Sequence, residues 1–355
     1  MRRILTQNLV SGMKLAKTIY SSDGVILLGQ GMELRPQYIK RLLDMEIMSV
    51  FIDDEISQGI ECNDVIDERT RMEAVKTVRE IVQCHTMGKT VDVRKAKQHV
   101  NNIVDELFYS KDILVNMSDL RAKSDYTFYH MVNVAVLSVM TGISLGYHEL
   151  NLRDLGVGAL LHDLGKVKID ENIYNKTDKL TDEEFEQIKQ HASYGFDMVR
   201  NMEAVNVLCA HVAYQHHERF DGQGYPRGLR GKGIHDFARI VALADVYDAL
   251  TADRPYRKAM LPYHAVEYLV AMGGTQFDPD LTSVFVENIA IYPVGTFVEL
   301  NTKEKAIVVT VNKLHKTRPV VRVLTEADGA LLKQPFELDL LNSPTYFING
   351  IIEEF

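Results

Sequence analysis

The sequence predicts a mainly α-helical protein, in which an all-helical core is flanked by small β-containing units at both ends. Three observations support this fold class. Apolar residues in the middle of the chain recur at intervals of three and four, the period of an amphipathic helix. A helix-capping signature stands at Thr181–Glu184. Short strand-like runs with turn signals are instead confined to about the first 60 and the last 60 residues.

The bulk composition limits the classes of protein to consider. At 355 residues, the chain is long for one domain, so we expect two or three. Its 46% hydrophobic and 25% charged residues are typical of an ordinary globular protein. The net charge of −9 argues against binding to a nucleic acid polymer or a membrane surface. It does not exclude a small anionic ligand, because local charge and bound metal govern a single site.

Residues 1–60 are predicted to form a small mixed α/β unit. Val25–Leu28 and Ser49–Ile52 are typical of short strands, and Pro36–Met45 is typical of a short helix. The dipeptide Asp23–Gly24 is a turn signal.

Residues 61–125 are predicted to form a helical connector. An apolar stripe follows one face of a helix here, made by Val93, Ala96, Val100, Ile103 and Leu107. Such a stripe suits a connector, a pair of helices that forms a homodimer, or packing against the next domain. The pattern alone leaves these alternatives open.

Residues 126–290 carry most of the histidines on further helices. The capping box predicts a helix that begins near residue 181 and carries His191. Val205–Glu218 and Ile240–Leu250 are predicted to be two more helices, the first ending in a His-His pair. Met131–Tyr147 has no charged residue, but it is shorter than the roughly 20 apolar residues that a membrane span needs. We therefore expect it to be a buried core helix.

Residues 291–355 are predicted to form a small β-rich unit. Phe297–Leu300, Ala306–Val311 and Val320–Leu324 are strand-like, and Asp328–Gly329 is typical of a hairpin turn.

The cysteines and the N-terminus bear on location. Cys62, Cys84 and Cys209 lie far apart with no CxxC spacing, which is typical of reduced, buried thiols in a cytosolic protein. The N-terminal segment begins with basic residues but lacks a sustained apolar run, so we expect no secretory signal. Both observations predict a cytoplasmic protein.

A series of histidines and aspartates predicts a metal centre. Five imidazoles and two carboxylates, without a cysteine, suit paired Fe, Mn or Zn ions better than a structural zinc. Taken singly, each residue is weak evidence, although an aspartate within IVALADVYDAL needs a partner if that helix is buried. Two ions about 3.5–4 Å apart activate water and clamp a phosphoryl group, so the series predicts a phosphodiesterase. The seven residues are His130, His162, Asp163, His191, His216, His217 and Asp245.

Four segments resemble the HD-GYP family of bacterial phosphodiesterases. They are HDLGK (162–166), HHERFDGQGYP (216–226), ADVYDALTADRPYRKA (244–259) and GGTQFDP (273–279). The likeness covers roughly residues 126–290, and it is specific because separate motifs occur in order. It implies an HD-type helical catalytic domain over that range.

The resemblance implies a division of the seven residues between two ions. His130, His162, Asp163 and Asp245 would hold one ion. Asp163 would bridge to a second ion, held by the three remaining histidines, His191, His216 and His217. A hydroxide bridging the two ions would be the nucleophile, with its pKa drawn towards neutrality by their charge.

Further residues receive roles from the same resemblance. Asp163 and Lys166 would act in catalysis, with Lys166 at the scissile phosphate or at the leaving oxygen. Tyr225 of the GYP loop would reach the substrate, and Gly222 and Gly224 would supply backbone freedom.

A basic cluster follows Asp245. Arg254, Arg257 and Lys258 are expected to bind substrate phosphate, because guanidinium groups fit phosphate oxygens bidentately. Arg254 is the best candidate by its place in the motif. Some family members hold a third metal with a glutamate, at a position that is Tyr126 here, so we expect two ions per chain. Fe or Mn is favoured, with Zn, Ni or another ion as an alternative.

The expected function is hydrolysis of cyclic di-GMP to pGpG, with a second cut to GMP. One alternative is a hydrolase of another cyclic dinucleotide, cyclic GMP–AMP, because metal ligands do not distinguish guanine from adenine. A second alternative is a non-catalytic sensor or adaptor that binds the dinucleotide or a diguanylate cyclase partner protein. The full set of seven predicted ligands favours the enzyme.

Overall fold

The computed structural model describes residues 1–21, 25–45, 47–89, 92–110, 114–115, 126–174, 176, 178–252 and 259–352. The chain divides into two compact units. One consists mainly of helices from residues 65–111 and 126–288, and the other of sheets from both ends of the chain. The predicted fold class, a helical core with small β-containing units, is confirmed.

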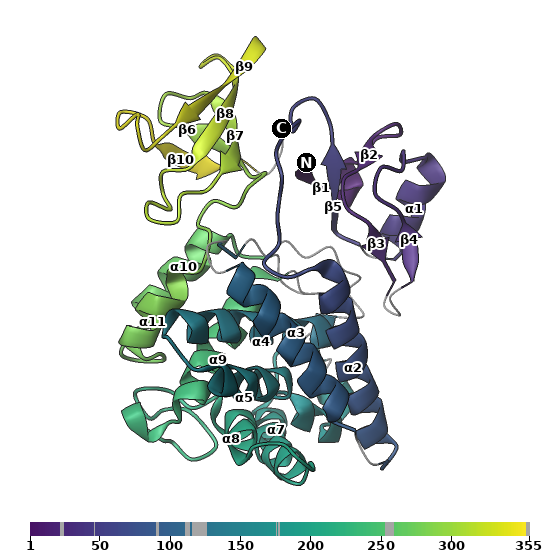
Figure 1. Ribbon diagram of the computed structural model, residues 1–355, viewed down its shortest axis with the longest axis vertical. Coiled ribbons are helices and arrows are strands. Elements are labelled where there is room, and N and C mark those ends of the chain that lie inside the picture. Colours follow the sequence, from purple (N-terminus) through teal and green to yellow (C-terminus); the bar gives the residue numbers. More distant parts are fainter. Residues whose placement is uncertain are drawn as a thin grey trace. The chain divides into compact units, whose positions relative to one another are not determined.

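The helical unit is built around α4 (Tyr126–Ser144), which lies beside α5 (Glu149–Leu160) and α9 (Asp236–Thr251) (Figure 1). The remaining helices are α2 (Glu68–Thr86), α3 (Arg94–Tyr109), α6 (Glu171–Tyr174), α7 (Asp182–Arg200), α8 (Val207–Gln215), α10 (Pro262–Ala271) and α11 (Pro279–Val286). Two 3₁₀ turns, η3 (Leu164–Lys168) and η4 (Gly231–Gly233), lie among them.

Helix α4 forms the centre of this core. Its segment Thr127–Ser144 is long and apolar enough to cross a membrane, but 78% of it is buried inside the protein. This burial is typical of the core helix of a folded domain and agrees with the expected buried core helix.

Helices α2 and α3 pack against the other helices of the same unit. The predicted apolar stripe runs along α3 from its N-cap residue Val93, and its five residues are all buried. At Gly156 of α5, an added Cβ would lie 2.6 Å from a Cγ of Val100, so α3 and α5 are in close contact. Packing against the helical core, one of the three alternatives for this stripe, is what the structure shows.

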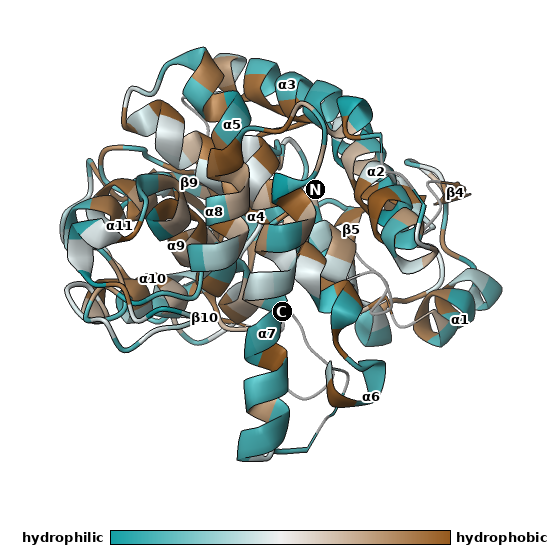
Figure 2. Ribbon diagram, turned by 90° about the horizontal axis from the view of Figure 1, so that it is seen from below, coloured by the Kyte–Doolittle hydropathy of each residue, from teal (hydrophilic) through white to brown (hydrophobic). Residues whose placement is uncertain are grey.

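Helix α7 begins where the capping signature predicts. The Thr181 side chain accepts from the backbone N–H of Glu184, and the Glu184 side chain accepts from the backbone N–H of Thr181. This reciprocal pair satisfies two of the free donors at the helix start. The helix surface is largely hydrophilic, with scattered hydrophobic residues (Figure 2).

The N-terminal part of the β-containing unit holds two small sheets and one helix. A three-stranded sheet has the order β1 (Arg2–Leu5), β5 (Ser49–Asp53) and β2 (Lys14–Leu15), and β3 (Ile19–Tyr20) pairs with β4 (Ile26–Leu28). Helix α1 (Pro36–Asp44) packs on their apolar core. The turn predicted at Asp23–Gly24 lies outside the described residues.

The C-terminal part is an antiparallel five-stranded sheet. Its order is β10 (Ile348–Ile351), β6 (Phe297–Leu300), β7 (Lys305–Thr310), β8 (Val320–Thr325) and β9 (Leu331–Asp339). The expected turn at Asp328–Gly329 joins β8 to β9, and Gly329 has a φ of 90°. The two edge strands were not predicted. Strand β9 contains Pro335 and is mostly exposed, which hides the alternation that marks a strand.

Candidate metal centre

Four helices and one turn bring the seven predicted ligands together. They are α4 with His130, the turn after α5 with His162 and Asp163, α7 with His191, the end of α8 with His216 and His217, and α9 with Asp245. Their ligand atoms form two groups, each with all atoms within 4.8 Å of one another. The first group is His130, His162 and Asp245, and the second is Asp163, His191, His216 and His217.

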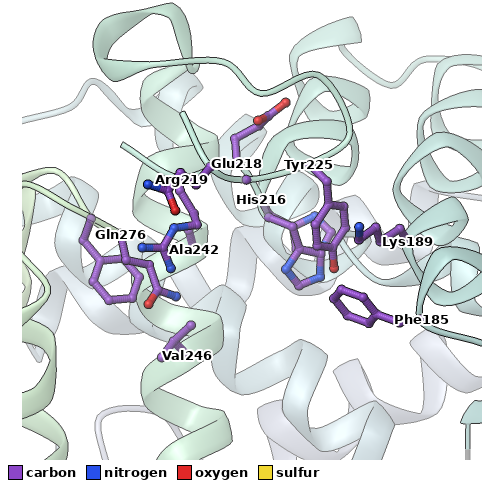
Figure 3. A pocket seen from close by; sticks show the side chains of 13 residues that line it. Phe185, Lys189, His216, Glu218, Arg219, Tyr225, Ala242, Val246 and Gln276 are labelled. Carbon is purple, nitrogen blue, oxygen red and sulfur yellow. The ribbon is translucent and has the colours of Figure 1, made fainter. Parts of the chain in front are cut away.

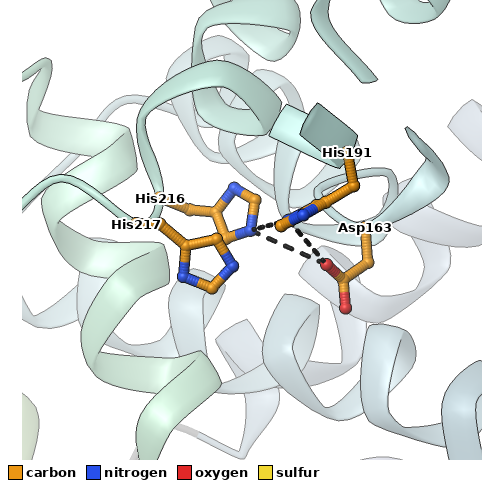
Figure 4. Close-up of side chains that lie close together, drawn as sticks. All are labelled: Asp163, His191, His216 and His217. Atoms are coloured by element: carbon orange, nitrogen blue, oxygen red, sulfur yellow. Dashed lines mark hydrogen bonds and ion pairs between the residues drawn. The ribbon is translucent and has the colours of Figure 1, made fainter. Parts of the chain in front are cut away.

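Asp163 belongs to the second group and also faces the first. Its Oδ2 lies 3.4 Å from His162 Nε2 and 3.9 Å from His130 Nε2. Its Oδ1 lies 3.6 Å from His191 Nε2 and 3.7 Å from His216 Nε2 (Figure 4). Each carboxylate oxygen therefore faces one group, which is the geometry of a ligand shared by two cations.

The backbone fixes the orientation of three of the rings. His162 Nδ1 lies 2.7 Å from the carbonyl of Ala159, His191 Nδ1 lies 2.5 Å from that of Ile188, and His216 Nδ1 lies 3.0 Å from that of Ala213. A carbonyl only accepts, so each Nδ1 carries the proton and donates. The Nε2 lone pairs are left for the site, as in metal-binding histidines.

The donor atoms fit a metal. His162 Nε2 and Asp163 Oδ1 are buried and have no hydrogen-bond partner among the described residues. His191 Nε2 and His216 Nε2 lie 3.4 Å apart. Because each of these rings donates to a backbone carbonyl through Nδ1, the proton is on Nδ1 and not on Nε2. Buried polar atoms are normally satisfied, so converging acceptors without a hydrogen-bond partner indicate a cation-binding site.

Two histidines of the second group have lowered pKa values. Burial lowers the pKa of His191 to about 4. Burial and the neighbouring rings of His216 and His191 hold the pKa of His217 well below its usual value. Both rings are therefore neutral at pH 7, the form that binds a metal.

The carboxylates are ionised. Burial alone would raise the pKa of Asp163, but the charge of Lys166 outweighs it and holds that pKa well below its usual value. Burial of His130 opposes its charged form, yet hydrogen bonds to Asp245 and Asp248 raise the pKa of this ring to about 10. Metal binding at His130 is therefore in competition with a proton.

Asp248 was not predicted as a site residue from the sequence. Its Oδ2 accepts from His130 Nδ1 at 2.7 Å, and its side chain is almost fully buried. Asp248 lies three residues after Asp245 on α9, so both face the same side of the helix. That spacing was the available signal. A carboxylate behind a metal-binding histidine fixes the ring and its tautomer.

Lys166 lies at the metal centre. It pairs with Asp163 Oδ2, and its ammonium lies 5.5 Å from the centre of the Tyr174 ring. Burial opposes its charged form, but the Asp163 charge outweighs burial and raises the pKa of Lys166. The lysine is thus a cation at pH 7, next to the carboxylate that faces both groups.

A close backbone approach joins the two halves of the site. A Cβ added at Gly165 would lie 1.9 Å from the carbonyl oxygen of His191 and 2.5 Å from the nitrogen of Gly195. Only glycine allows η3 to lie so near α7. This contact brings the turn that carries Asp163 beside His191.

The GYP loop is held by Glu218. Its carboxylate accepts from the backbone N–H groups of Arg227 and Leu229, at 2.8 and 2.9 Å. Gly222 has a φ of 83°, as expected for its predicted role. Gly224 is needed for a different reason than backbone angle, because an added Cβ would lie 2.3 Å from the nitrogen of Arg219.

Tyr225 lies against the metal centre. Its ring stacks on that of His217, with centroids 4.8 Å apart and planes inclined by 29°. Burial, followed by the charges of Asp163 and Asp245, raises the pKa of Tyr225, so its phenol stays protonated.

A pocket of about 290 Å³ opens beside the second group. Tyr225, Lys189 and Phe185 lie on one side, and Arg219 and Gln276 lie on the other (Figure 3). His216 and His217 also line it. Of these, Phe185, Lys189 and Gln276 were not assigned a site role from the sequence, because nothing in the sequence shows that their separate elements line one pocket.

Three predicted substrate residues lie outside the described part of the chain. They are Arg254, Arg257 and Lys258, and their role stays a prediction. The side chain of Tyr126 is also outside it. Helix α8 ends at Gln215, earlier than predicted, and His216 is its C-cap residue. The His-His pair therefore lies in the turn after the helix, which lets the two rings point at one site.

Comparison with protein families gives two matches. A model described as an HD domain matches residues 109–281. A model described as a KOW domain associated with HD domain matches residues 297–354.

Two of the similar proteins are named cyclic dinucleotide phosphodiesterases. The chain is 34% identical over 241 residues to cyclic di-GMP phosphodiesterase PA4108 of Pseudomonas aeruginosa, covering 68% of this chain and 58% of that protein. It is 35% identical over 172 residues to the 3′3′-cGAMP-specific phosphodiesterase 3 of Vibrio cholerae, covering 48% of this chain and 37% of that protein. The chain thus spans about half the length, or less, of these relatives.

A solved structure shares the fold. Bd1817, an HDG"Y"P protein from Bdellovibrio bacteriovorus, superimposes with a TM-score of 0.52 at 19% identity. The likeness covers 80% of this chain and 97% of that one. The family model and the relatives identify an HD domain in residues 109–281 of this chain, as its resemblance to the HD-GYP proteins predicted.

Proposed function

We propose that the protein is a metal-dependent phosphodiesterase that hydrolyses cyclic di-GMP to pGpG and, by a second cut, to GMP. One observation carries the proposal: the two oxygens of Asp163 face two separate groups of buried histidine nitrogens and a further carboxylate. The relative named a cyclic di-GMP phosphodiesterase supports the substrate.

The residues present would hold two divalent cations, with Asp163 shared between them. When bound, such ions lower the pKa of water and offset the charge that develops on phosphoryl oxygens. We propose two ions, with Fe or Mn favoured, because the donors are imidazole and carboxylate. The unsatisfied Nε2 of His162 and Oδ1 of Asp163 support this loading.

The chain's own residues would position the substrate. Lys166 is a half-buried cation next to Asp163, placed to stabilise negative charge on a phosphate bound there. The protonated phenol of Tyr225 is a hydrogen-bond donor at the pocket wall. Both residues fit a phosphodiester in the pocket.

A second candidate substrate is 3′3′-cGAMP, favoured by the relative of that specificity. The metal-binding residues do not distinguish the bases. Gln276 and Arg219 line the pocket opposite Tyr225, where an amide and a guanidinium are able to contact a base edge. A side-by-side assay with the two dinucleotides separates these candidates.

The test uses the whole chain, freed of metal and reloaded with Mn(II) or anaerobic Fe(II). We expect hydrolysis of cyclic di-GMP by the loaded protein and loss of at least about 10³-fold in rate for Asp163→Ala, because both ions lose a ligand. Asp197→Ala is the control, since Asp197 is exposed on α7 and pairs only with Arg200 among the described ion pairs. Product release is measured by chromatography.

Two results contradict the proposal. One is cleavage of cyclic di-GMP at the wild-type rate by the metal-free Asp163→Ala variant. The other is a loaded wild-type protein that cleaves neither dinucleotide. Elemental analysis of the same samples counts the ions, and three ions per chain contradict the proposed pair.

A further inference from the structure

Arg71 of α2 is a buried cation that is not one of the predicted metal ligands. Its side chain is 3% exposed. Its Nη1 donates to Asn133 Oδ1 at 2.6 Å, and its Nε lies 3.6 Å from Glu68 Oε2. A buried guanidinium requires such partners, because an unpaired charge in the interior is costly.

Asn133 relays this contact to the metal centre. It is fully buried on α4, three residues after His130. Its Nδ2 donates to Asp248 Oδ1 at 2.7 Å, while Asp248 Oδ2 accepts from His130 Nδ1 at 2.7 Å. Arg71 is thus joined to a predicted metal ligand through three consecutive hydrogen bonds.

The chemistry of the donors gives this chain of contacts one direction. Arginine only donates, so Asn133 must turn its oxygen towards Arg71. The amide nitrogen of Asn133 must then face Asp248. The carboxylate of Asp248 accepts from Asn133 on one oxygen and from the Nδ1–H of His130 on the other. The Nε2 of His130, which lies 3.1 Å from Asp245 Oδ1, is the nitrogen left facing the site.

We propose that Arg71 is a positioning residue that acts through Asn133 and Asp248 to orient His130 for cation binding. The inference rests on the proposed function only in taking His130, His162 and Asp245 as one cation site, and not on any substrate. Arg71 lies before residue 109, where the match to the HD domain begins. The proposed relay therefore begins on a helix of the same compact unit that lies outside the matched range.

The experiment measures metal affinity. Metal-free wild type, Arg71→Met and Asn133→Leu are titrated with Mn(II), and free ion is followed by electron paramagnetic resonance. We expect each variant to bind one of the two ions with 10–100-fold lower affinity, the usual cost of removing a hydrogen-bond partner of a metal ligand. The second ion, held by the other group, stays within about threefold of wild type. The double variant, Arg71→Met with Asn133→Leu, has no lower affinity for that ion than either single variant, because both changes break the same series of hydrogen bonds.

Two further variants separate positioning from a merely structural role. Arg69→Met is the matched control, because Arg69 is exposed on the same helix and pairs with Glu73. It keeps both affinities. Asn133→Asp keeps an acceptor for Arg71, but replaces the neutral amide donor to Asp248 with a second carboxylate. A structural role predicts no loss of metal affinity in Asn133→Asp, whereas the relay predicts the same loss at one ion.

The outcomes decide the inference. Unchanged affinity for both ions in Arg71→Met, or in Asn133→Asp, overturns it. A thermal melting curve tests whether Arg71→Met folds. If it does not fold, the metal affinity of Asn133→Asp decides the question. A wild-type protein that binds two ions but cleaves no dinucleotide defeats the proposed function alone, and the affinity comparison still stands. A wild type that binds no ion defeats both.

Discussion

Histidines in this centre use one ring nitrogen for the protein and leave the other for the site. His162, His191 and His216 donate Nδ1 to backbone carbonyls, whereas His130 donates to Asp248. The sequence predicted which residues converge, because their motifs resemble those of a known family. It did not predict these anchors, because a carbonyl three residues back is a property of every helix and leaves no mark in the residue types.

The depressed pKa of His191 leads to a prediction about stability. In the unfolded chain this ring has a pKa near 6.5, and in the folded, metal-free protein its pKa is about 4. The unfolded state therefore takes up a proton first as the pH falls, and stability is lost between about pH 6.5 and 4. From pH 7 to pH 5, His191 contributes a loss of about 2 kcal/mol in the free energy of unfolding.

Urea denaturation of metal-free wild type and His191→Asn at both pH values checks this. Asparagine does not titrate, so the variant should lose about 2 kcal/mol less than wild type on acidification. Contributions from other groups, including the raised pKa of His130, cancel in the comparison. Equal losses in the two proteins contradict the prediction.

At the scale of elements, the helices that carry the site were predicted more closely than their contacts. The capping box at Thr181 placed the start of α7 correctly. The end of α8 was predicted too late, because the run of residues up to Glu218 continues the helical pattern while the backbone turns after Gln215. The contact between η3 and α7 at Gly165 was not predicted, since nothing local distinguishes a glycine that packs from one that bends.

Gly165 offers a test of that contact. Alanine there places a Cβ 1.9 Å from a backbone oxygen of α7, so the two elements must move apart. We expect Gly165→Ala to lower the free energy of unfolding by about 1–3 kcal/mol or more, the usual cost of overpacking, and to weaken metal binding. The change is measured by thermal and chemical denaturation, with metal content determined in parallel.

Gly233→Ala is the matched control for Gly165→Ala. Gly233 has no atom within 4 Å of an added Cβ and no positive φ. It should keep near-wild-type stability and metal content. A Gly165→Ala variant that equals this control shows that the close approach does not shape the site.

For the whole molecule, the sequence predicted the order of parts but not how they combine. The predicted boundaries, 1–60, 61–125, 126–290 and 291–355, remain predictions. The structure groups residues 65–111 with the helical core, and the N-terminal with the C-terminal segment. Such groupings depend on contacts between distant residues, such as Arg71 with Asn133. A periodic stripe shows that a helix has an apolar face, but not which partner covers it.

A truncation tests this grouping. A fragment of residues 112–290 lacks α2 and α3, whose buried residues include Val75, Val78, Val100 and Ile103. Each such side chain contributes roughly 1.5–3 kcal/mol when buried, so their loss is comparable to the stability of a whole domain. We expect this fragment to lack a cooperative thermal transition and residues 65–290 to retain one. Circular dichroism during heating distinguishes them, and a cooperatively melting short fragment contradicts the grouping.

The sharing of Asp163 between two groups has a consequence for the order of events. Without ions, the carboxylates of Asp163, Asp245 and Asp248 outnumber the cationic Lys166 and His130, so the metal centre carries a net negative charge that opposes a phosphodiester bound there. Two divalent ions would add four positive charges and invert the local sign, within a protein whose net charge is −9. The metal ions would therefore bind before the substrate. The anionic cyclic dinucleotide would be attracted only to a centre that already carries them.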